Sequence, residues 1–264
     1  MILAELVILQ PQRLANRLVL SSFLSNHFYI LTIGKVIMMY KTVLVTGATR
    51  GIGRALVIDL CNKGYRVFAT GRDEVQLQQL IDQTGCVGES CDLSQPEAVD
   101  ELFKKAKNIL GHIDVLINNA GMNSRKCEVV NTSLEEFEQQ YAINLRAPYL
   151  LCRAAMQEML PNKYGYIINI VSTVAKRSNE TMGIYTAMKQ GFAGLNNVLM
   201  KEAQPHGIKV TAVYPGGSNT GFREQERPQY MSPESVATMI SQLLRNPKDV
   251  VVHELTFRPL VEIE

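Results

Sequence analysis

Tyr185 and Lys189 form a Y-x-x-x-K pattern, and Ser172 lies thirteen residues before the tyrosine. If this run is helical, the phenol and the ammonium share one face, because side chains at positions i and i+4 are neighbours. A nearby cation favours the phenolate and lowers the pKa of tyrosine from its usual value of about 10, which suits acid–base catalysis near neutral pH. The Ser172 hydroxyl is suited to hold a carbonyl oxygen on which negative charge develops. Because Y-x-x-x-K also occurs by chance, this pattern alone does not establish a site.

A glycine-rich turn lies about 140 residues upstream of Tyr185, with Gly47, Gly51 and Gly53 in the spacing G-x-x-x-G-x-G. It follows the apolar run 43–45 and precedes a helix-like stretch over 54–61 and a strand-like run over 65–70. The order strand, glycine turn, helix, strand binds a dinucleotide pyrophosphate at the helix N-terminus. Glycine permits the tight turn and the close approach of backbone to phosphate, whereas an isolated glycine cluster is more often an ordinary turn.

The spacing of these glycines resembles that of the short-chain dehydrogenase/reductase family. The resemblance continues, in the family's order and near its usual separations, at Asn118-Asn119-Ala120-Gly121, Asn144, Ser172, Tyr185, Lys189 and Pro215-Gly216. It covers roughly residues 41–264 and points to NADP-preferring members that resemble 3-oxoacyl reductases. The resemblance implies a hydride transfer between a nicotinamide and a carbonyl or alcohol substrate. It also implies a single α/β Rossmann-fold domain, with a doubly wound parallel sheet of about seven strands and helices on both faces.

The resemblance implies a role for each of four catalytic candidates. Tyr185 is the expected acid/base, and Lys189 is expected to lower the tyrosine pKa and to bind the nicotinamide ribose. Ser172 is expected to orient and polarise the substrate carbonyl. Asn144 is expected to hold a water in a proton relay, and its alternative role is a helix kink without a catalytic part.

Further residues are expected to bind the cofactor, by the resemblance or by charge. They are Gly47, Thr49, Arg50, Gly51, Ile52, Gly53, Arg72, Asp92, Leu93, Asn118, Ala120, Gly121, Tyr185, Lys189, Pro215, Gly216 and Thr220. Asp92 matches the acidic position that contacts the adenine, but it also fits a cap for the helix that follows Leu93. Thr220 matches the threonine near the carboxamide, and Asn118 is expected to fix both the cofactor and the central strand.

The choice between NADP(H) and NAD(H) rests on charge. Gly71 stands where NAD-binding members of the family carry an acid, which binds the ribose 2′-hydroxyl and repels a 2′-phosphate. Arg72 follows Gly71, and Arg50 precedes the second glycine of the turn. Two guanidinium groups can bind a phosphate through charge-assisted hydrogen bonds, so we expect NADP(H). The alternative is that both arginines are solvated, with Asp73 and Glu74 close enough to pair with Arg72.

Composition indicates a folded protein in a reducing compartment. The chain has 264 residues, 46% of them hydrophobic and 20% charged, which fits one α/β domain with a large core. The net charge of +2 and the lack of a basic patch give no reason to expect nucleic-acid binding. Five scattered cysteines favour the cytoplasm over a disulfide framework. No paired C-x-x-C or histidine cluster predicts a metal site.

Alternating strands and helices predict the parallel sheet. Strands are expected near 42–46, 65–70, 86–91, 113–118, 165–171, 208–213 and 249–254. Helices are expected near 52–62, 74–83, 96–110, 134–160, 184–204 and 233–245. In the family the helices near 134–160 and 184–204 pair across a dimer interface, so the resemblance implies a homodimer or homotetramer. An apolar helix face is equally expected for packing on the sheet.

Residues 1–40 do not belong to this pattern. The run from Leu18 to Gly34 is largely apolar and carries no charged residue. Three interpretations compete: an upstream segment with the true start at Met38 or Met39, a weakly membrane-associated segment, or an added helix. Seventeen residues are short for a membrane span, and no clear cleavage site marks a signal peptide. The domain boundaries expected are therefore 1–40 for this N-terminal extension and 41–264 for the Rossmann domain.

The segments 173–184 and 216–231 are expected to contact the substrate, and the second resembles the family's mobile lid. The lid is short and polar, which argues against a large steroid and for a smaller or polar carbonyl compound. A non-catalytic dinucleotide sensor or scaffold on the same fold is the alternative function. Such a protein is expected to lose the tyrosine or the lysine, whereas this chain keeps Ser172, Tyr185 and Lys189.

Overall fold

The computed structural model describes residues 39–264, apart from residues 124, 223–226 and 263–264. The predicted N-terminal extension lies outside the described residues, except for its last two residues. Of these, Tyr40 is buried, and its ring packs against the rings of Tyr164 and Tyr166 at centroid distances of 5.3 and 5.7 Å. The described residues form one compact unit.

The centre of this unit is a seven-stranded sheet in which every pairing is parallel, in the order β3-β2-β1-β4-β5-β6-β7. The strands are β1 (Thr42–Thr46), β2 (Arg66–Gly71), β3 (Val87–Ser90), β4 (Val115–Asn118), β5 (Gly165–Ile170), β6 (Ile208–Pro215) and β7 (Glu254–Phe257). Strands β1, β4 and β5 are buried along their whole length, since helices cover both faces of the sheet. The predicted doubly wound fold is confirmed.

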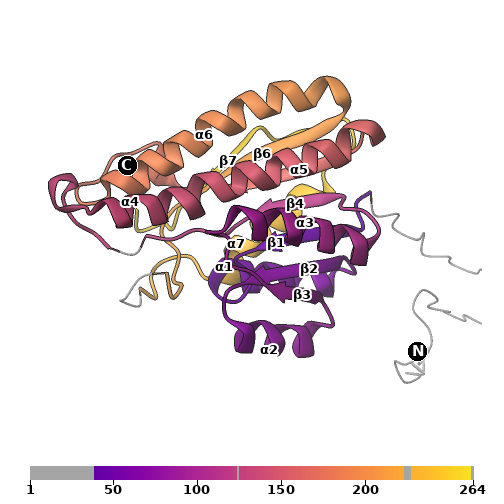
Figure 1. The fold of residues 1–264 in the computed structure, drawn as a ribbon, viewed down its shortest axis with the longest axis horizontal. Helices are drawn as coiled ribbons and strands as arrows, with labels where there is room; N and C mark the ends of the chain where they lie inside the picture. Colours follow the sequence, from indigo (N-terminus) through magenta and orange to yellow (C-terminus); the bar gives the residue numbers. More distant parts are fainter. Residues whose placement is uncertain (1–38, 124, 223–226, 263–264) are drawn as a thin grey trace, which may run out of the picture. The chain divides into compact units, whose positions relative to one another are not determined.

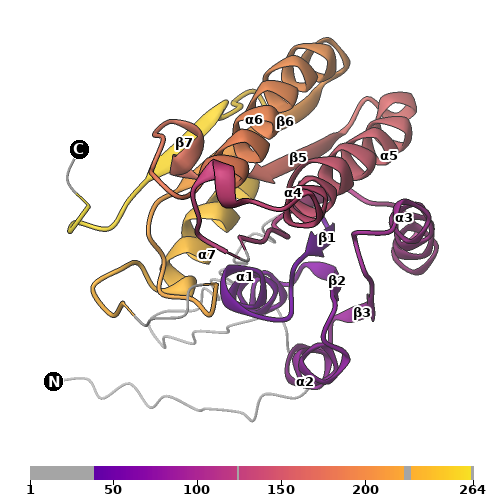
Figure 2. The same ribbon diagram turned by 60° about the vertical axis from the view of Figure 1, so that its left-hand side comes forward.

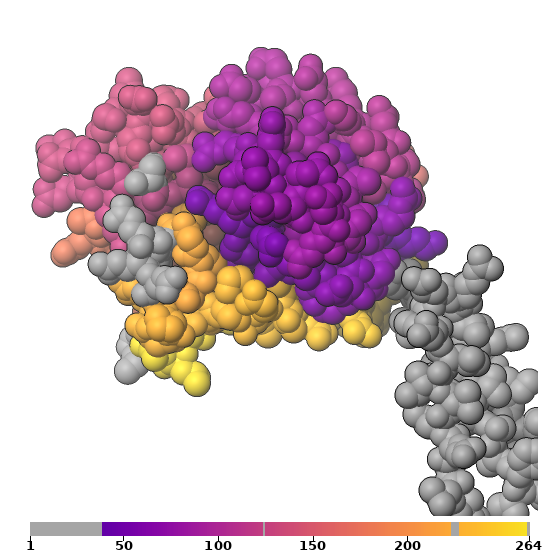
Figure 3. All heavy atoms as spheres, turned by 90° about the horizontal axis from the view of Figure 1, so that it is seen from below, coloured from indigo at the N-terminus to yellow at the C-terminus, as the bar shows by residue number. Residues whose placement is uncertain are grey.

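The helices form two layers (Figures 1 and 2). One layer holds α1 (Gly51–Asn62), α2 (Glu74–Thr84) and α7 (Pro233–Gln242). The other holds α3 (Pro96–Leu110), α4 (Leu134–Tyr141), α5 (Ala147–Asn162) and α6 (Gly183–Ala203). Contacts between α1 and α7 bring the first and last helices together, and Figure 3 shows this face with indigo and orange-to-yellow residues side by side. No helix of the described residues is both long and apolar enough to cross a membrane.

The last strand is not where the sequence predicted it. The predicted strand 249–254 follows the apolar run Val250–Val252, but β7 begins at Glu254. In this segment, side chains of β6 bind the first carbonyl oxygens, and backbone hydrogen bonding to β6 begins only at His253, whose carbonyl oxygen accepts from the N–H of Ala212 at 3.0 Å. Lys209 Nζ donates to the carbonyl oxygens of Pro247 (2.9 Å) and Val250 (2.6 Å). The prediction was wrong because it depended on apolar residues and not on these side-chain hydrogen bonds.

The predicted helix 134–160 is interrupted by a π-helical turn over Ala142–Arg146, between α4 and α5. A π turn inserts an extra residue into the ladder of backbone hydrogen bonds and often marks a functional position. Asn144 lies inside this turn and is fully buried. This position is compatible with both roles that the sequence allowed for Asn144, a helix kink and a site residue.

The carboxyl ends of the parallel strands lie at one edge of the sheet. Strand β1 pairs with β2 on one side and with β4 on the other, so the chain direction across the sheet reverses between β1 and β4. Open α/β sheets bind ligands outside the carboxyl edge at such a reversal point. Thr46, Asn118 and Ile170 end β1, β4 and β5 at this edge.

Candidate active site

The glycine turn between β1 and α1 is held by a clamp from the loop after β4. Asn119 Nδ2 donates to the carbonyl oxygens of Thr46 (2.9 Å) and Gly47 (3.1 Å). Thr46 Oγ1 in return accepts hydrogen bonds from the backbone N–H groups of Asn119 and Ala120, each at 3.1 Å. No role for Thr46 or for Asn119 itself was predicted from the sequence, although the Asn-Asn pair lies in this loop.

The turn requires glycine at two kinds of position. Gly47 and Gly51 have φ angles of 65° and 54°, a left-handed conformation that favours glycine. Gly53 is required by close approach, because a Cβ there would lie 2.1 Å from the carbonyl oxygen of Gly47 and 2.5 Å from Asn119 Nδ2. The turn therefore brings the N-terminus of α1 close to the backbone of β1, with its free N–H groups at the carboxyl edge.

Thr220, in the segment after β6, lies beside the N-terminus of α1. A Cβ placed on Gly51 would lie 3.2 Å from Cβ of Thr220. Ile52, the next residue of α1, is half-buried. The structure therefore brings Thr220 to the predicted phosphate-binding turn, although the two are far apart in the sequence. A helix N-terminus favours negative charge, so this place suits a phosphate group.

Arg50 and Arg72 are exposed at the same side of the sheet, and neither forms an ion pair with another described residue. The acidic residues that competed for Arg72 are engaged elsewhere. Asp73 caps α2 by accepting from the N–H of Gln76 at 2.9 Å. Glu74 accepts from Ser90 Oγ at 3.0 Å. Both guanidinium groups are thus available to a ligand.

Thr49 fills the space beside Gly71 at the end of β2. A Cβ on Gly71 would lie 2.5 Å from Cγ2 of Thr49 and 2.9 Å from its Oγ1. An acidic side chain at residue 71 therefore does not fit without a shift of Thr49. The packing of Thr49 against Gly71 therefore leaves no room for the acid that was expected at this position in an NAD-binding protein.

Asp92, Leu93 and Asn118 have structural contacts of their own. Asp92 is exposed, and its Oδ1 accepts from the N–H of Ser94 at 3.0 Å, which orders the turn before α3. Leu93 is buried in the hydrophobic core. Asn118 Nδ2 donates to Asn169 Oδ1 at 2.9 Å and so joins β4 to β5. Asp92 and Leu93 therefore have structural roles next to α3, and Asn118 supports the central strands through its Nδ2, while its buried Oδ1 accepts no hydrogen bond from the described residues.

Lys189 and Asn144 lie beside Gly121 at the carboxyl edge. A Cβ on Gly121 would lie 3.2 Å from Asn144 Oδ1 and 3.6 Å from Lys189 Nζ, so a residue larger than glycine would press against both side chains. Lys189 Nζ donates to the carbonyl oxygen of Ile170 at 3.0 Å, at the end of β5. The remaining donors of the Lys189 head group suit the hydroxyl groups of a ribose.

Burial acts against the charge on Lys189. The side chain is 3% exposed, and desolvation lowers the pKa of Lys189 from 10.5 to about 7. Only the protonated lysine is a cation that can lower the pKa of the neighbouring tyrosine. In the absence of bound anions the lysine is therefore charged below about pH 7 and loses its proton above it.

Both polar atoms of the Asn144 side chain bind the backbone of Met122. Asn144 Oδ1 accepts from the N–H of Met122 at 3.1 Å, and its Nδ2 donates to the Met122 carbonyl oxygen at 2.8 Å. The side chain therefore fixes the loop that follows Gly121. A water in a relay would depend on the remaining hydrogen-bonding capacity of this amide or on the backbone of the π turn.

Tyr185 is placed by the first turns of α6, with only 7% of the residue exposed. Lys189 Nζ lies 5.9 Å from the centre of its ring, as the i,i+4 spacing predicted. The ring of Phe222, from the predicted lid, lies 6.0 Å from the Tyr185 ring and is tilted against it.

Ser172 caps the short 3₁₀ helix η3 (Thr173–Ala175). Its Oγ accepts from the N–H of Val174 at 3.3 Å, and η3 contacts α6.

Pro215 and Gly216 end β6 beside the C-terminal segment. A Cβ on Gly216 would lie 2.6 Å from Glu262 Oε2, and the N–H of Gly217 donates to Glu262 Oε1 at 3.0 Å. This contact was not predicted, since nothing in the sequence joins residue 262 to the Pro-Gly pair. The C-terminal segment thus covers one side of the loop that carries Thr220.

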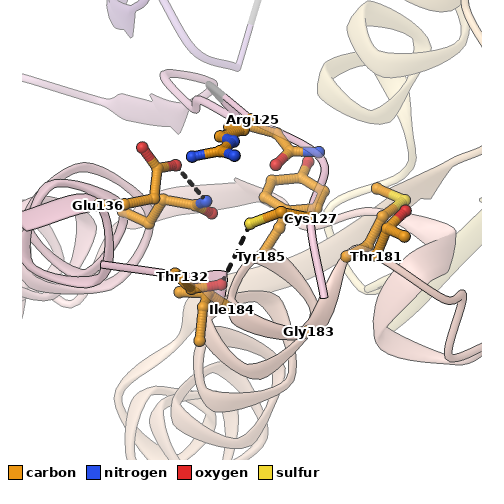
Figure 4. Close-up of a pocket in the computed structure, with 11 residues that line it drawn as sticks. Arg125, Cys127, Thr132, Glu136, Thr181, Gly183, Ile184 and Tyr185 are labelled. Atoms are coloured by element: carbon orange, nitrogen blue, oxygen red, sulfur yellow. Dashed lines mark hydrogen bonds between the residues drawn. The ribbon is translucent and has the colours of Figure 1, made fainter. Parts of the chain in front are cut away.

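A pocket opens beside Tyr185, between the loop after β4, α4 and the start of α6 (Figure 4). Its wall is polar. It is lined by Asn123, Arg125, Cys127, Thr132, Glu136, Gln140, Thr181, Met182, Gly183, Ile184 and Tyr185. Of these, only the segment 181–185 overlaps the predicted substrate-contacting segments. The polar residues of the loop after β4 and of α4 were missed.

Residues 41–231 match the family described as short chain dehydrogenase. The chain belongs to this family. An uncharacterized oxidoreductase of Staphylococcus aureus (strain MRSA252) is 31% identical to this short chain dehydrogenase over 227 residues, which is 83% of this chain and 97% of the relative.

Two solved structures are similar to this short chain dehydrogenase over most of its length. One is an alcohol dehydrogenase from the archaeon Thermococcus sibiricus complexed with 5-hydroxy-NADP, with 27% identity, a TM-score of 0.78, and coverage of 85% of this chain and 98% of that chain. The other is a metagenomic short-chain oxidoreductase in complex with NADP, with 32% identity, a TM-score of 0.75, and coverage of 84% and 98%.

Proposed function

We propose that this protein is an NADP(H)-dependent oxidoreductase that interconverts a small alcohol and its carbonyl compound. The observation that carries the proposal is that Lys189 Nζ lies 5.9 Å from the centre of the Tyr185 ring and close to Gly121. Lys189 and the N-terminus of α1 lie at the same edge of the sheet, so one extended dinucleotide reaches both. When bound, its nicotinamide supplies or accepts the hydride.

The side chains then handle the proton and the substrate oxygen. In oxidation, the Tyr185 phenolate accepts the hydroxyl proton while the carbon-bound hydrogen leaves as hydride, with its electron pair. In reduction, Tyr185 returns a proton to the oxygen as the carbonyl carbon gains the hydride. Ser172 donates a hydrogen bond to the substrate oxygen. Lys189 binds the ribose hydroxyls and, in its charged form, favours the phenolate.

The preference for NADP(H) is supported by the exposed Arg50 and Arg72 and by the packing of Thr49 against Gly71. A 2′-phosphate at this corner gains charge-assisted hydrogen bonds, and the neighbouring Asp73 and Glu74 are bound to Gln76 and Ser90. The NADP-type ligands of the two similar structures point in the same direction. The narrower resemblance to 3-oxoacyl reductases stays a prediction.

The decisive experiment is Tyr185→Phe, because phenylalanine keeps the ring and removes the acid. NADPH oxidation is followed with a panel of small aldehydes, ketones, quinones and 3-oxoacyl thioesters, with NADH in parallel. We expect turnover to fall by roughly 10²–10⁴-fold, while NADPH binding, measured by its fluorescence, stays unchanged. A sensor or scaffold would show no turnover in the wild type, and Tyr185→Phe would leave its function in the cell intact.

We also propose a homodimer or homotetramer in a reducing cytoplasm. All five cysteines are free thiols in the structure, which supports the compartment. Tyr149 of α5 and Val198 of α6 are 43% and 56% exposed, which supports a contact between copies through these helices. Light scattering of the purified protein measures the oligomeric state directly, and a monomer would contradict this part of the proposal.

A further inference from the structure

Gln140, on α4, is a buried amide in the wall of the pocket beside Tyr185. The residue is 2% exposed. Its Nε2 donates to Glu136 Oε1 at 2.8 Å, one turn earlier in the helix. Its Oε1 is buried and accepts no hydrogen bond from any described residue. Leaving a buried acceptor unsatisfied destabilises the protein, so a hydrogen-bond partner for this oxygen is favoured.

The orientation of the Gln140 amide is determined by chemistry. A carboxylate accepts hydrogen bonds, and only the nitrogen end of an amide donates them. The contact with Glu136 therefore requires Nε2 on the Glu136 side and leaves Oε1 as the free end. What Gln140 offers to the pocket is an acceptor, which selects a ligand that carries a donor.

Gln139 and Glu135, on the same helix, form a pair like that of Gln140 and Glu136, and the two pairs differ in burial. Gln139 Nε2 donates to Glu135 Oε1 at 3.4 Å with the same i,i−4 spacing. Gln139 is exposed, so water can satisfy its remaining acceptor. Gln140 makes the same contact inside the pocket, and its oxygen is enclosed.

A second acceptor in the lining of the pocket is also without a hydrogen-bond donor. Asn123 Oδ1 is also buried without a hydrogen bond among the described residues. Cys127 Sγ and Thr132 Oγ1 bond to each other at 3.3 Å, as the dashed line in Figure 4 shows, so they are already paired. Arg125 and Glu136 bring one charge of each sign to the lining. The lining therefore does not select a net anion or cation, and its unmet hydrogen-bonding groups are the two buried acceptors, Gln140 Oε1 and Asn123 Oδ1.

We propose that the substrate carries a second hydrogen-bond donor, a hydroxyl or an ammonium, that binds Gln140 Oε1 while the reacting oxygen faces Tyr185. This inference rests on the proposed oxidoreductase function and names its substrate class: small diols and amino alcohols, with the hydroxy- and amino-carbonyl compounds derived from them. A site built to bind a donor discriminates strongly against an analogue that lacks it, because its buried acceptor is then left unpaired.

The test uses matched alcohols that differ only in the second donor: butan-2-ol, butane-2,3-diol and 3-aminobutan-2-ol. Each is assayed for NADP+ reduction, and its binding to the NADP+-loaded protein is measured by calorimetry. The variants are Gln140→Met, which removes the acceptor and keeps the length of the side chain, and Gln139→Met as the matched surface control. The diol and the amino alcohol separate a hydroxyl from an ammonium.

We expect the wild type to favour at least one donor-bearing compound over butan-2-ol by about 10-fold or more in kcat/KM. Gln140→Met should remove this preference, and Gln139→Met should keep both the preference and the wild-type activity on butan-2-ol. Equal losses on both kinds of alcohol in a folded Gln140→Met would overturn the inference. A wild type that oxidises butan-2-ol as efficiently as the donor-bearing compounds would also overturn the inference. This outcome can be measured even if Gln140→Met does not fold.

Binding separates this inference from the proposed function. If the donor-bearing compounds bind the loaded wild type more tightly than butan-2-ol and Gln140→Met removes this difference, but none is oxidised, then the binding of a donor by Gln140 holds and the proposed oxidoreductase activity on these compounds fails. If all compounds are oxidised with equal kcat/KM and bind equally, the activity holds and the role of Gln140 is refuted.

Discussion

Lys189 should make the stability of the cofactor-free protein rise with pH, and Lys189→Met should abolish that effect. Its pKa is lowered from 10.5 to about 7 by burial. Between these two values the unfolded chain holds a proton that the folded chain has released, so the free energy of unfolding increases as pH rises. From pH 6 to pH 8.5 this contribution amounts to about 2 kcal/mol.

The assay is urea unfolding of the wild type and Lys189→Met at pH 6 and pH 8.5, without cofactor. The variant also loses the hydrogen bond to the Ile170 carbonyl, but that cost is the same at both pH values. We therefore expect the stability of the wild type relative to the variant to increase by about 2 kcal/mol between the two pH values. Lys201→Met removes an exposed lysine from the same helix and serves as the control.

A difference between wild type and variant that does not change with pH would refute the reasoning, since it would mean that Lys189 keeps its proton to pH 8.5. The same linkage predicts proton uptake when an anionic dinucleotide binds near pH 8, because negative charge nearby favours the ammonium. Calorimetry in two buffers of different ionisation enthalpy measures that uptake.

Two further predictions concern the cofactor site. Gly53→Ala should lower the free energy of unfolding by about 1–3 kcal/mol and impair NADPH binding, because its Cβ would lie 2.1 Å from the Gly47 carbonyl oxygen. Gly194→Ala, where a Cβ meets nothing within 4 Å, should leave binding unchanged and raise helix stability by up to about 1 kcal/mol in thermal unfolding. Arg50→Ala and Arg72→Ala should each weaken NADPH binding about 10-fold and leave NADH binding unchanged in fluorescence titrations. Equal weakening of both cofactors would contradict the phosphate argument.

Features that depend on neighbours in the sequence could be predicted. The glycine spacing before α1 gave the turn, and the i,i+4 spacing placed Lys189 near the Tyr185 ring. The alternation of strands and helices gave the parallel sheet. These patterns act through local geometry, so the residues themselves carry the information.

Features that depend on distant partners could not be predicted. The clamp by Asn119 exists only because β4 lies next to β1. The unpaired oxygen of Gln140 follows from burial, and the surface pair of Gln139 looks identical in the sequence. The segment before β7 is bound by the side chain of Lys209, which donates to backbone carbonyl groups there. The apolar pattern does not contain this contact, so it predicted a strand that begins earlier than β7.

The parallel pairing of β1 with β4 has a consequence for how the protein folds. Val43 pairs with Val67 of β2 only 24 residues later, but with Val115 of β4 after 72 residues. Non-local contacts form slowly, because the chain between them must be ordered first. Asn119 arrives with β4, so the glycine turn gains its support only after this slower step. During refolding, helical circular dichroism should therefore recover before the ability to bind NADPH does.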